Sequence, residues 1–274
     1  MVKVKVYAKV NISLLINGVE NGFHMLDSVV ASASIADVIS VQKSEKDSVI
    51  TSSKIESIEN KIYSLIGYLR SLYNIPCVSI CVENNIPLGG GLGGSSADMA
   101  GVILGINELF TLNLSKQTLV DIANTTGSDT AFMLEGGCGK IINRSEVSDR
   151  FVMRSKKAVI ATKGFCDTAK VFSLFDNSPQ TLEYNDNSLL ISALENGTSI
   201  DGLYKNVLTP CAMQINNAIR EGLEVLGKGA SMSGSGSSVF AFDVEKAKIE
   251  KLKELGFKVF DCEIGNFTSE VIKQ

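Results

Sequence analysis

The sequence has a single histidine, no tryptophan, four prolines and no long hydrophobic run. None of its six cysteines forms a C-x-x-C pair, and one histidine leaves a Cys/His zinc site almost without ligands. We therefore expect reduced, mostly buried thiols. No apolar run approaches the roughly 18 residues that span a bilayer, and the alternating start MVKVKVYAKV does not resemble a signal peptide. These absences predict a cytoplasmic protein without a membrane segment.

A large excess of charge is also lacking. The 274 residues include 26 Lys and Arg against 30 Asp and Glu, a formal net charge of −4. This balance excludes a general nucleic-acid binder and a protein drawn to acidic membranes. With 45% hydrophobic residues, a chain of this length can bury one large core or two packed ones. We expect a small molecule as partner, and the composition leaves both a monomer and a homodimer open.

Hydrophobic periodicity predicts strands and helices that do not alternate as strict βαβ units, which favours an α+β fold. Alternation at residues 2–7 and 10–16 predicts two strands or one bent strand, and Asn17-Gly18 can close a hairpin after them. The charged stretch 143–157 is the expected solvated connection between two domains. Helices are expected over 55–74, from the end of the glycine-rich stretch to about residue 110, and over 115–124. Further strands are expected at 77–82, 136–142, 158–162, 239–242 and 258–262.

Two glycine-containing patterns match known nucleotide-binding motifs only in part. Between Gly89 and Gly94 the sequence satisfies G-x-G-x-x-G, but a Rossmann site needs its glycines directly after a strand, and five residues intervene. The acidic residue expected about 20 positions later would be Glu108, inside a predicted helix. Residues 222–229 nearly match a Walker A loop, yet a glycine occupies the hydroxyl position. Gly227 as a helix C-cap explains this second pattern.

The stretch from Gly89 to Gly94 fits a different kind of phosphate site. It contains five glycines, and Ser95 and Ser96 follow at the start of a predicted helix. Glycine lets the backbone approach phosphate oxygens closely, and a helix N-terminus adds about half a positive charge. Such a loop can hold a triphosphate without a basic surface. A glycine-rich turn that is capped by serine is the structural alternative.

Three motifs together resemble the GHMP kinase superfamily. They are AKVN around Lys9, PLGGGLGGSSADMA from Pro87, and ASMSGSGSS near the end of the chain, and they occur in the superfamily's order. The resemblance implies an ATP-dependent, Mg²⁺-using kinase of a small metabolite, with a two-domain α+β fold and its active site in the inter-domain cleft. It also implies an N-terminal ATP-binding domain over 1–148, similar to domain 2 of ribosomal protein S5, and a C-terminal GHMP kinase domain over 149–274.

Shorter segments resemble one branch of this superfamily. NGFHML, TGSDTAF, DTAKVF and KNVL are similar to enzymes of isoprenoid precursor synthesis whose acceptor alcohol carries a cytidine diphosphate group. Three departures from the family's sequence pattern affect the expected identity of the acceptor more than the expected kinase class. Phe23 replaces the usual tyrosine before His24, Ala97 stands where the family often has a second serine, and Lys140 to Asn143 replace a usual Gly-Arg-Gly-Glu.

The resemblance implies a role for each matching residue. Lys9 and Asp129 would be catalytic, and Ser96 is a candidate ligand of Mg²⁺. Asn11, Phe23, His24, Thr168 and Phe172 would bind the substrate, with the two phenyl rings on either side of the cytosine. Gly234, Ser235 and Gly236 would form the third motif. The ATP phosphates would lie on Pro87, Leu88, Gly89, Gly90, Gly91, Leu92, Gly93, Gly94, Ser95, Ser96 and Ala97.

Taken singly, these residues have ordinary structural explanations. Lys9 could lie on a solvated strand face, Asp129 could cap a helix, and Phe172 could be core. His24 could be a surface histidine or a satisfied core histidine. Their joint occurrence with the glycine loop favours the kinase site. The alternatives are another GHMP kinase, of homoserine or mevalonate type, and a non-catalytic ATP-binding sensor.

Overall fold

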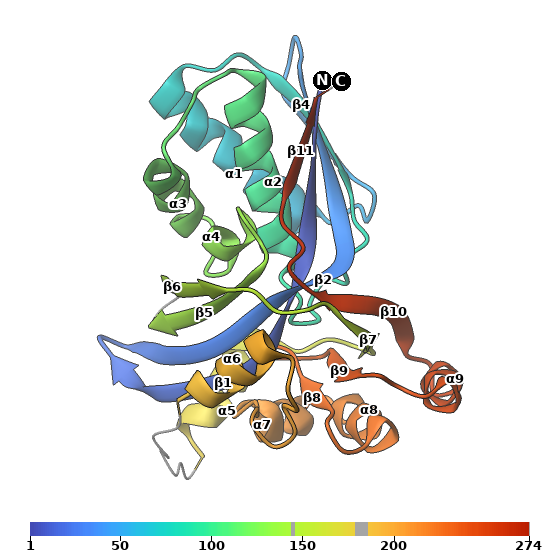
Figure 1. Ribbon diagram of the computed structural model, residues 1–274. Helices are drawn as coiled ribbons and strands as arrows, with labels where there is room; N and C mark the ends of the chain where they lie inside the picture. The colour runs from blue at the N-terminus through green and yellow to red at the C-terminus, as the bar shows by residue number, and fades with distance from the viewer. Residues whose placement is uncertain (144–145, 179–185, 274) are drawn as a thin grey trace.

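A long antiparallel hairpin runs through the molecule in the computed structural model, which describes residues 1–143, 146–178 and 186–273 (Figure 1). Its strands are β1 (Val2–Glu20) and β2 (Phe23–Lys43). Where the sequence predicts two strands or one bent strand, the structure has the single strand β1. The pairing of β1 with β2 shifts register at three places. Asn21-Gly22 closes the hairpin instead of Asn17-Gly18. Both turn residues have positive φ, 50° and 78°, as the tight turn requires.

The hairpin is the centre of an 11-stranded sheet. Along its main path the strand order is β11-β1-β2-β10-β7-β9-β8, while β4 and β5 also pair with β2. Only β3 and β4 pair in parallel among the described strands, so the Rossmann alternative lacks its parallel βαβ unit. The other strands are β3 (Ser48–Thr51), β4 (Val78–Glu83), β5 (Cys138–Asn143), β6 (Glu146–Phe151), β7 (Lys156–Thr162), β8 (Ser231–Met232), β9 (Val239–Phe242), β10 (Lys258–Gly265) and β11 (Glu270–Lys273).

The helices form two groups, one beside the upper part of the hairpin and the other below it (Figure 1). One group is α1 (Glu56–Tyr73), α2 (Gly94–Leu109), α3 (Lys116–Asn124) and α4 (Thr130–Met133). The other group is α5 (Thr168–Asp176), α6 (Ser188–Asn196), α7 (Thr209–Ile215), α8 (Ala218–Leu226) and α9 (Lys246–Glu254). Buried apolar side chains likewise form two clusters, one containing Ile39 and Ile103, the other Ile219 and Val239. The α+β class and the two-domain arrangement are confirmed.

The stretch 143–157 is not a simple solvated connection, because its described part contains β6. This strand pairs with β5, with Asp149 opposite Lys140. Charged side chains are tolerated there because β6 pairs on one side only in the described chain. β10 and β11 return from the C-terminal half to pair with β2 and β1. The boundary after residue 148 therefore falls inside a strand, and it stays a prediction.

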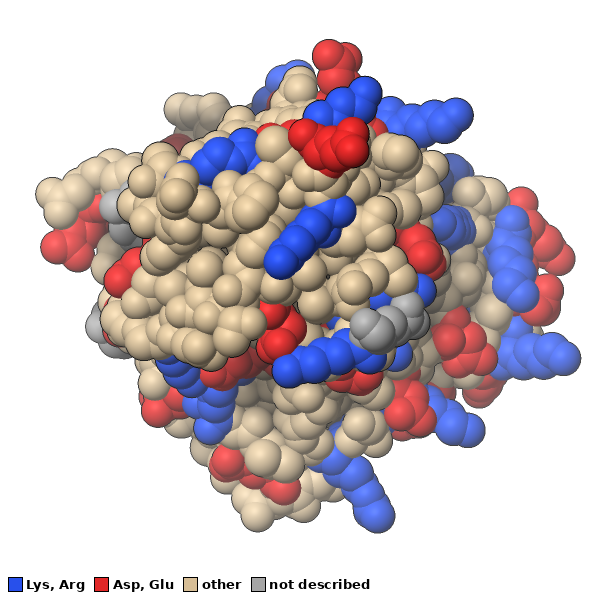
Figure 2. All heavy atoms as spheres, turned by 90° about the horizontal axis from the view of Figure 1, so that it is seen from above, with Lys and Arg blue, Asp and Glu red and all other residues tan. Residues whose placement is uncertain are grey.

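Several smaller expectations can be compared directly with the structure. The six cysteines are free and four of them are buried, as expected. Gly227 is the C-cap of α8 and its N–H donates to the Leu223 carbonyl, so the helix-end explanation of the Walker-like pattern is confirmed. No helix in the described residues is long and apolar enough to cross a bilayer. On the face shown in Figure 2, the described Lys and Arg side chains stand among Asp and Glu and form no continuous basic surface.

Candidate active site

Lys9 and Asp129 meet although 120 positions separate them in the chain. Lys9 lies on β1 and is only 5% exposed, so the explanation as a solvated strand face is wrong. Its Nζ donates to Asn11 Oδ1 and lies 3.4 Å from Asp129 Oδ2. Asp129 begins α4 without a side-chain cap bond, and 30% of its side chain is exposed. A buried ammonium thus lies beside a carboxylate that a ligand can reach.

Asn11 is held so that its amide oxygen faces the ammonium. Its Nδ2 donates to Ser28 Oγ at 2.8 Å, which leaves Oδ1 for Lys9. Ser28 Oγ in turn donates to the Ser13 carbonyl at 2.7 Å. A buried charge is stable only when it is paired and hydrogen-bonded. This chain of hydrogen bonds along the hairpin, together with Asp129, supplies those partners.

The glycine loop leads from β4 into α2 as the sequence predicts. Gly93 is the N-cap of α2 with φ of 76°, and neither a side-chain cap nor an acidic residue occupies the first turn. The alternative of a serine-capped turn is therefore wrong. The free N–H groups of the first turn are suited to an anion. Pro87, Leu88, Gly91, Gly93, Ser95 and Ser96 are half-buried, Gly89 is exposed, and Gly90, Leu92, Gly94 and Ala97 are buried.

The third motif lies against the glycine loop. Ser233 Oγ donates to the Gly91 carbonyl at 3.0 Å, and Ser238 N–H donates to the Gly90 carbonyl at 3.0 Å. A Cβ on Gly91 would lie 2.1 Å from the Ser233 carbonyl oxygen, so only glycine fits this crossing. Gly234 also approaches closely, since its Cβ would lie 3.1 Å from the Gly91 carbonyl oxygen. The two segments fix each other's backbone.

Two further side chains hold the third motif in place. Asn206 is buried, and its Nδ2 donates to the carbonyls of Met232 and Gly234 at 2.8 and 2.7 Å. Thr168 Oγ1 and Ser235 Oγ lie 2.8 Å apart. Sequence reasoning used the KNVL segment only as a resemblance and missed this role of Asn206. Only the position of this segment in the family pattern could have indicated the role of Asn206, because no short sequence motif connects the segment to the third motif.

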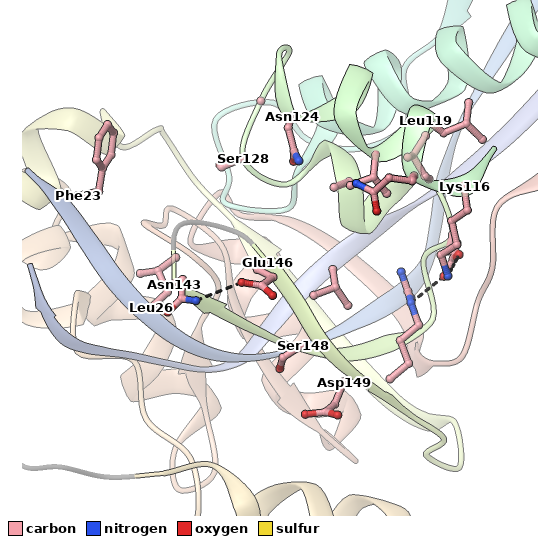
Figure 3. A pocket seen from close by; sticks show the side chains of 18 of the residues that line it. Phe23, Leu26, Lys116, Leu119, Asn124, Ser128, Asn143, Glu146, Ser148 and Asp149 are labelled. Atoms are coloured by element: carbon pink, nitrogen blue, oxygen red, sulfur yellow. Dashed lines mark hydrogen bonds and ion pairs between the residues drawn. The ribbon is translucent and has the colours of Figure 1, made fainter. Parts of the chain in front are cut away.

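The predicted base-binding residues lie at the hairpin tip and on α5. His24 contacts Phe172 with ring centroids 4.6 Å apart, and its Nε2 lies 2.7 Å from Asp176 Oδ1. Phe172 is half-buried, so it is not simply core. Phe23 is 44% exposed at the end of the hairpin and stands at the edge of the same cavity in Figure 3. Asp176, which orients the histidine, was not foreseen.

One cavity of about 1550 Å³ connects these aromatic residues with the catalytic segment. Its lining includes the aromatic residues Phe23, His24 and Phe172 and also Gly127 and Ser128. Figure 3 shows it continuing between α3 and the β5–β6 pair. Gly127 and Ser128 directly precede Asp129, so the cavity borders the segment that carries this carboxylate, although Asp129 and Lys9 are not among its lining residues.

A buried carboxyl pair underlies the glycine loop. Asp37 and Asp98 are both 0% exposed. Asp37 accepts hydrogen bonds from the backbone N–H groups of Asn85 and Ile86, and Asn84 Nδ2 donates to Asp98. Burial raises the pKa of Asp98 to about 8, with the Asp37 charge as the second cause, and burial raises the pKa of Asp37 to about 6. Sequence reasoning missed this pair.

Known proteins resemble this chain over nearly its whole length. Residues 60–137 match the family of GHMP kinases N terminal domain. The chain is 30% identical to 4-diphosphocytidyl-2-C-methyl-D-erythritol kinase of Caldicellulosiruptor bescii, over 96% of each chain. It is 32% identical to the kinase of the same name from Syntrophomonas wolfei, over 91% of this chain and 92% of that protein.

Solved structures agree in fold. A crystal structure of 4-(cytidine 5'-diphospho)-2C-methyl-D-erythritol kinase has a TM-score of 0.78 and 26% identity, over 97% of this chain and 100% of the other. Homoserine kinase from Cytophaga hutchinsonii, 19% identical over 99% of this chain and 97% of that one, shares the fold with a TM-score of 0.70. The fold and the glycine loop thus define a GHMP kinase, which uses ATP. Within that class, the chain belongs to the 4-diphosphocytidyl-2-C-methyl-D-erythritol kinase family.

Proposed function

We propose that this chain transfers the γ-phosphoryl group of ATP to the 2-hydroxyl of 4-diphosphocytidyl-2-C-methyl-D-erythritol, in the non-mevalonate synthesis of isoprenoid precursors. One observation carries the proposal. A single cavity joins the aromatic group of Phe23, His24 and Phe172 to the segment that places Asp129 beside Lys9. The family membership and the glycine loop support the same reaction. The reaction is placed in the cytoplasm, in a monomer or a homodimer.

Asp129 and Lys9 have different roles in the phosphoryl transfer. Asp129 takes the proton of the acceptor hydroxyl as that oxygen bonds to the γ-phosphorus, and the bond from phosphorus to the ADP oxygen breaks. Lys9 stabilises the charge on the attacking oxygen and on the transferred phosphoryl group. The pair suits these roles because the Lys9 ammonium is buried, whereas the Asp129 carboxylate is partly exposed.

The glycine loop and α2 hold the ATP phosphates through backbone N–H groups. Mg²⁺ fits this arrangement as an ion carried mainly by phosphate oxygens, because no cluster of three His, Cys, Asp or Glu side chains in the described chain could hold a metal. Ser96, half-buried in the first turn of α2, is the residue that would hold it. The bound ion would neutralise charge on the β- and γ-phosphates.

The acceptor binds at the C-terminal side of the cleft. The faces of Phe23 and Phe172 hold the cytosine, and His24, oriented by Asp176, donates or accepts a hydrogen bond at its edge. In this proposal Asn11, next to Lys9, helps to place the acceptor, and Thr168 lines the pocket of the base. Residues 1–148 serve as the ATP-binding domain and 149–274 as the C-terminal domain in this proposal.

The test is ADP release from ATP with three acceptors offered separately: 4-diphosphocytidyl-2-C-methyl-D-erythritol, homoserine and mevalonate. Turnover is expected with the first alone, and ³¹P NMR of the product should show a new phosphomonoester. Turnover with homoserine or mevalonate instead would reassign the chain within the GHMP kinases. ATP binding without product from any acceptor would make it a sensor.

Phe172→Ala should mainly weaken acceptor binding. Loss of one stacking ring is worth about 1–3 kcal/mol, so the KM for the acceptor should rise about 5- to 150-fold while the KM for ATP stays constant. Phe172→Tyr keeps the ring face and serves as the matched control. Cytidine nucleotides should inhibit the wild type competitively with the acceptor. Unchanged acceptor kinetics of Phe172→Ala would place Phe172 outside the base site.

A further inference from the structure

Phe165 presents a largely exposed ring at the first glycine of the loop. It lies between β7 and α5 and is 66% exposed. A Cβ built on Gly89 would lie 3.4 Å from Phe165 Cβ and Cδ2, so the ring packs on the Gly89 backbone. The rest of the ring faces solvent. A single exposed phenyl group is common on protein surfaces, so its setting decides whether it has a role.

The backbone under this ring is fixed on both sides. Ser237 Oγ donates to the Gly164 carbonyl at 2.9 Å, and Asn216 Nδ2 donates to the Lys163 carbonyl at 2.8 Å. Gly164 has φ of 67°, and its Cβ would lie 3.0 Å from Asn216 Nδ2, so the tight turn before Phe165 requires glycine. Phe165 is therefore held next to the loop by Ser237, in the segment that contains the third motif, and by Asn216 at the end of α7.

The position of the ring along the glycine loop indicates which substrate it meets. At the other end of the loop, a Cβ on Gly93 would lie 3.1 Å from Lys9 Cγ, so the γ-phosphate belongs there. An ATP molecule that follows the loop away from Lys9 brings its nucleoside toward Gly89. The acceptor cavity contains Phe172 but not Phe165 in its described lining. The exposed ring thus lies on the ATP side of the cleft.

We propose that Phe165 is a nucleotide-binding residue whose exposed face packs against the nucleoside of ATP where it leaves the glycine loop. The inference rests on the ATP site of the proposed function and adds to it the first contact for the adenosine. Stacking on a phenyl ring tolerates any base. Phe165 therefore contributes affinity for a purine nucleotide, without choosing between adenine and guanine.

Kinetics give the first test. Phe165→Ala should raise the KM for ATP about 5- to 150-fold, with kcat at saturating ATP and the KM for the acceptor unchanged. The KM for GTP, where GTP is used, should rise by the same factor. Tyr68→Ala, which removes an exposed ring from α1, is the matched control. An effect on the acceptor KM in place of the ATP KM would overturn the assignment.

The absence of tryptophan from the chain allows a direct second test. Phe165→Trp creates a sole tryptophan at the loop, and its emission should be quenched by a non-hydrolysable ATP analogue but not by the acceptor. Tyr68→Trp should respond to neither. If calorimetry shows that the analogue binds but the tryptophan emission does not change, the role of Phe165 is refuted and the ATP site is not. No binding of the analogue to the wild type would instead refute the ATP site itself.

Discussion

Asp129→Asn should lower kcat by about 10²- to 10⁴-fold, because an amide cannot take the proton of the acceptor hydroxyl. The KM values for ATP and the acceptor should change little, since asparagine keeps the shape of the side chain. Steady-state release of ADP, measured at saturating concentrations of both substrates, gives the comparison. The substitution also removes the carboxylate beside the buried Lys9 ammonium, whose hydrogen bond to Asn11 remains.

Two controls separate catalysis from folding. Asp121→Asn makes the same chemical change on the exposed surface of α3 and should keep full activity. Thermal unfolding of Asp129→Asn should show a folded protein, although its melting temperature should fall because Lys9 loses its counter-charge. A folded Asp129→Asn variant with wild-type kcat would show that another group, or water alone, takes the proton.

The sequence allowed the class of fold and the glycine loop to be predicted, because both depend on local patterns. Periodicity located most strands and helices, and glycine spacing located the loop that begins α2. The ordinary explanation of Lys9 failed for a physical reason. Alternation shows which residues share a face, but it does not show that residues 6–16 of β1 are buried on both faces. Only the resemblance to GHMP kinases selected Lys9 in advance.

Contacts between distant segments could not be predicted in this way. The Asn11 N–H donates to Ser233 Oγ at 3.1 Å, a contact that joins the first strand to the third motif. Asn206 reaches the same motif from a third segment. Such contacts arise from the packing of the two helical groups around one hairpin. Likewise, a charged stretch gave no hint of β6, whose pairing with β5 depends on backbone hydrogen bonds.

The carboxyl pair under the glycine loop belongs to this unforeseen group, and it should make the protein less stable as pH rises. The folded-state pKa of Asp98, about 8, lies above the usual 3.8 of the unfolded chain. Its stabilising contribution is therefore complete below the unfolded pKa and is lost as pH rises through the folded pKa. Asp37, with a pKa raised to about 6, acts in the same direction. Each excess proton in the folded state corresponds to about 1.4 kcal/mol per pH unit.

Asp98→Asn should remove most of this dependence. The amide is neutral at every pH, and its Nδ2 can donate to the neighbouring buried Asp37 carboxylate, as a protonated Asp98 does. The free energy of unfolding of the wild type should thus fall relative to Asp98→Asn between about pH 4 and pH 8, by several kcal/mol in total. Urea denaturation followed by circular dichroism measures the difference at each pH. Asp121→Asn, an exposed carboxylate, should instead follow the wild type. Parallel curves for the wild type and Asp98→Asn would show that Asp98 carries no proton in the folded protein over this pH range.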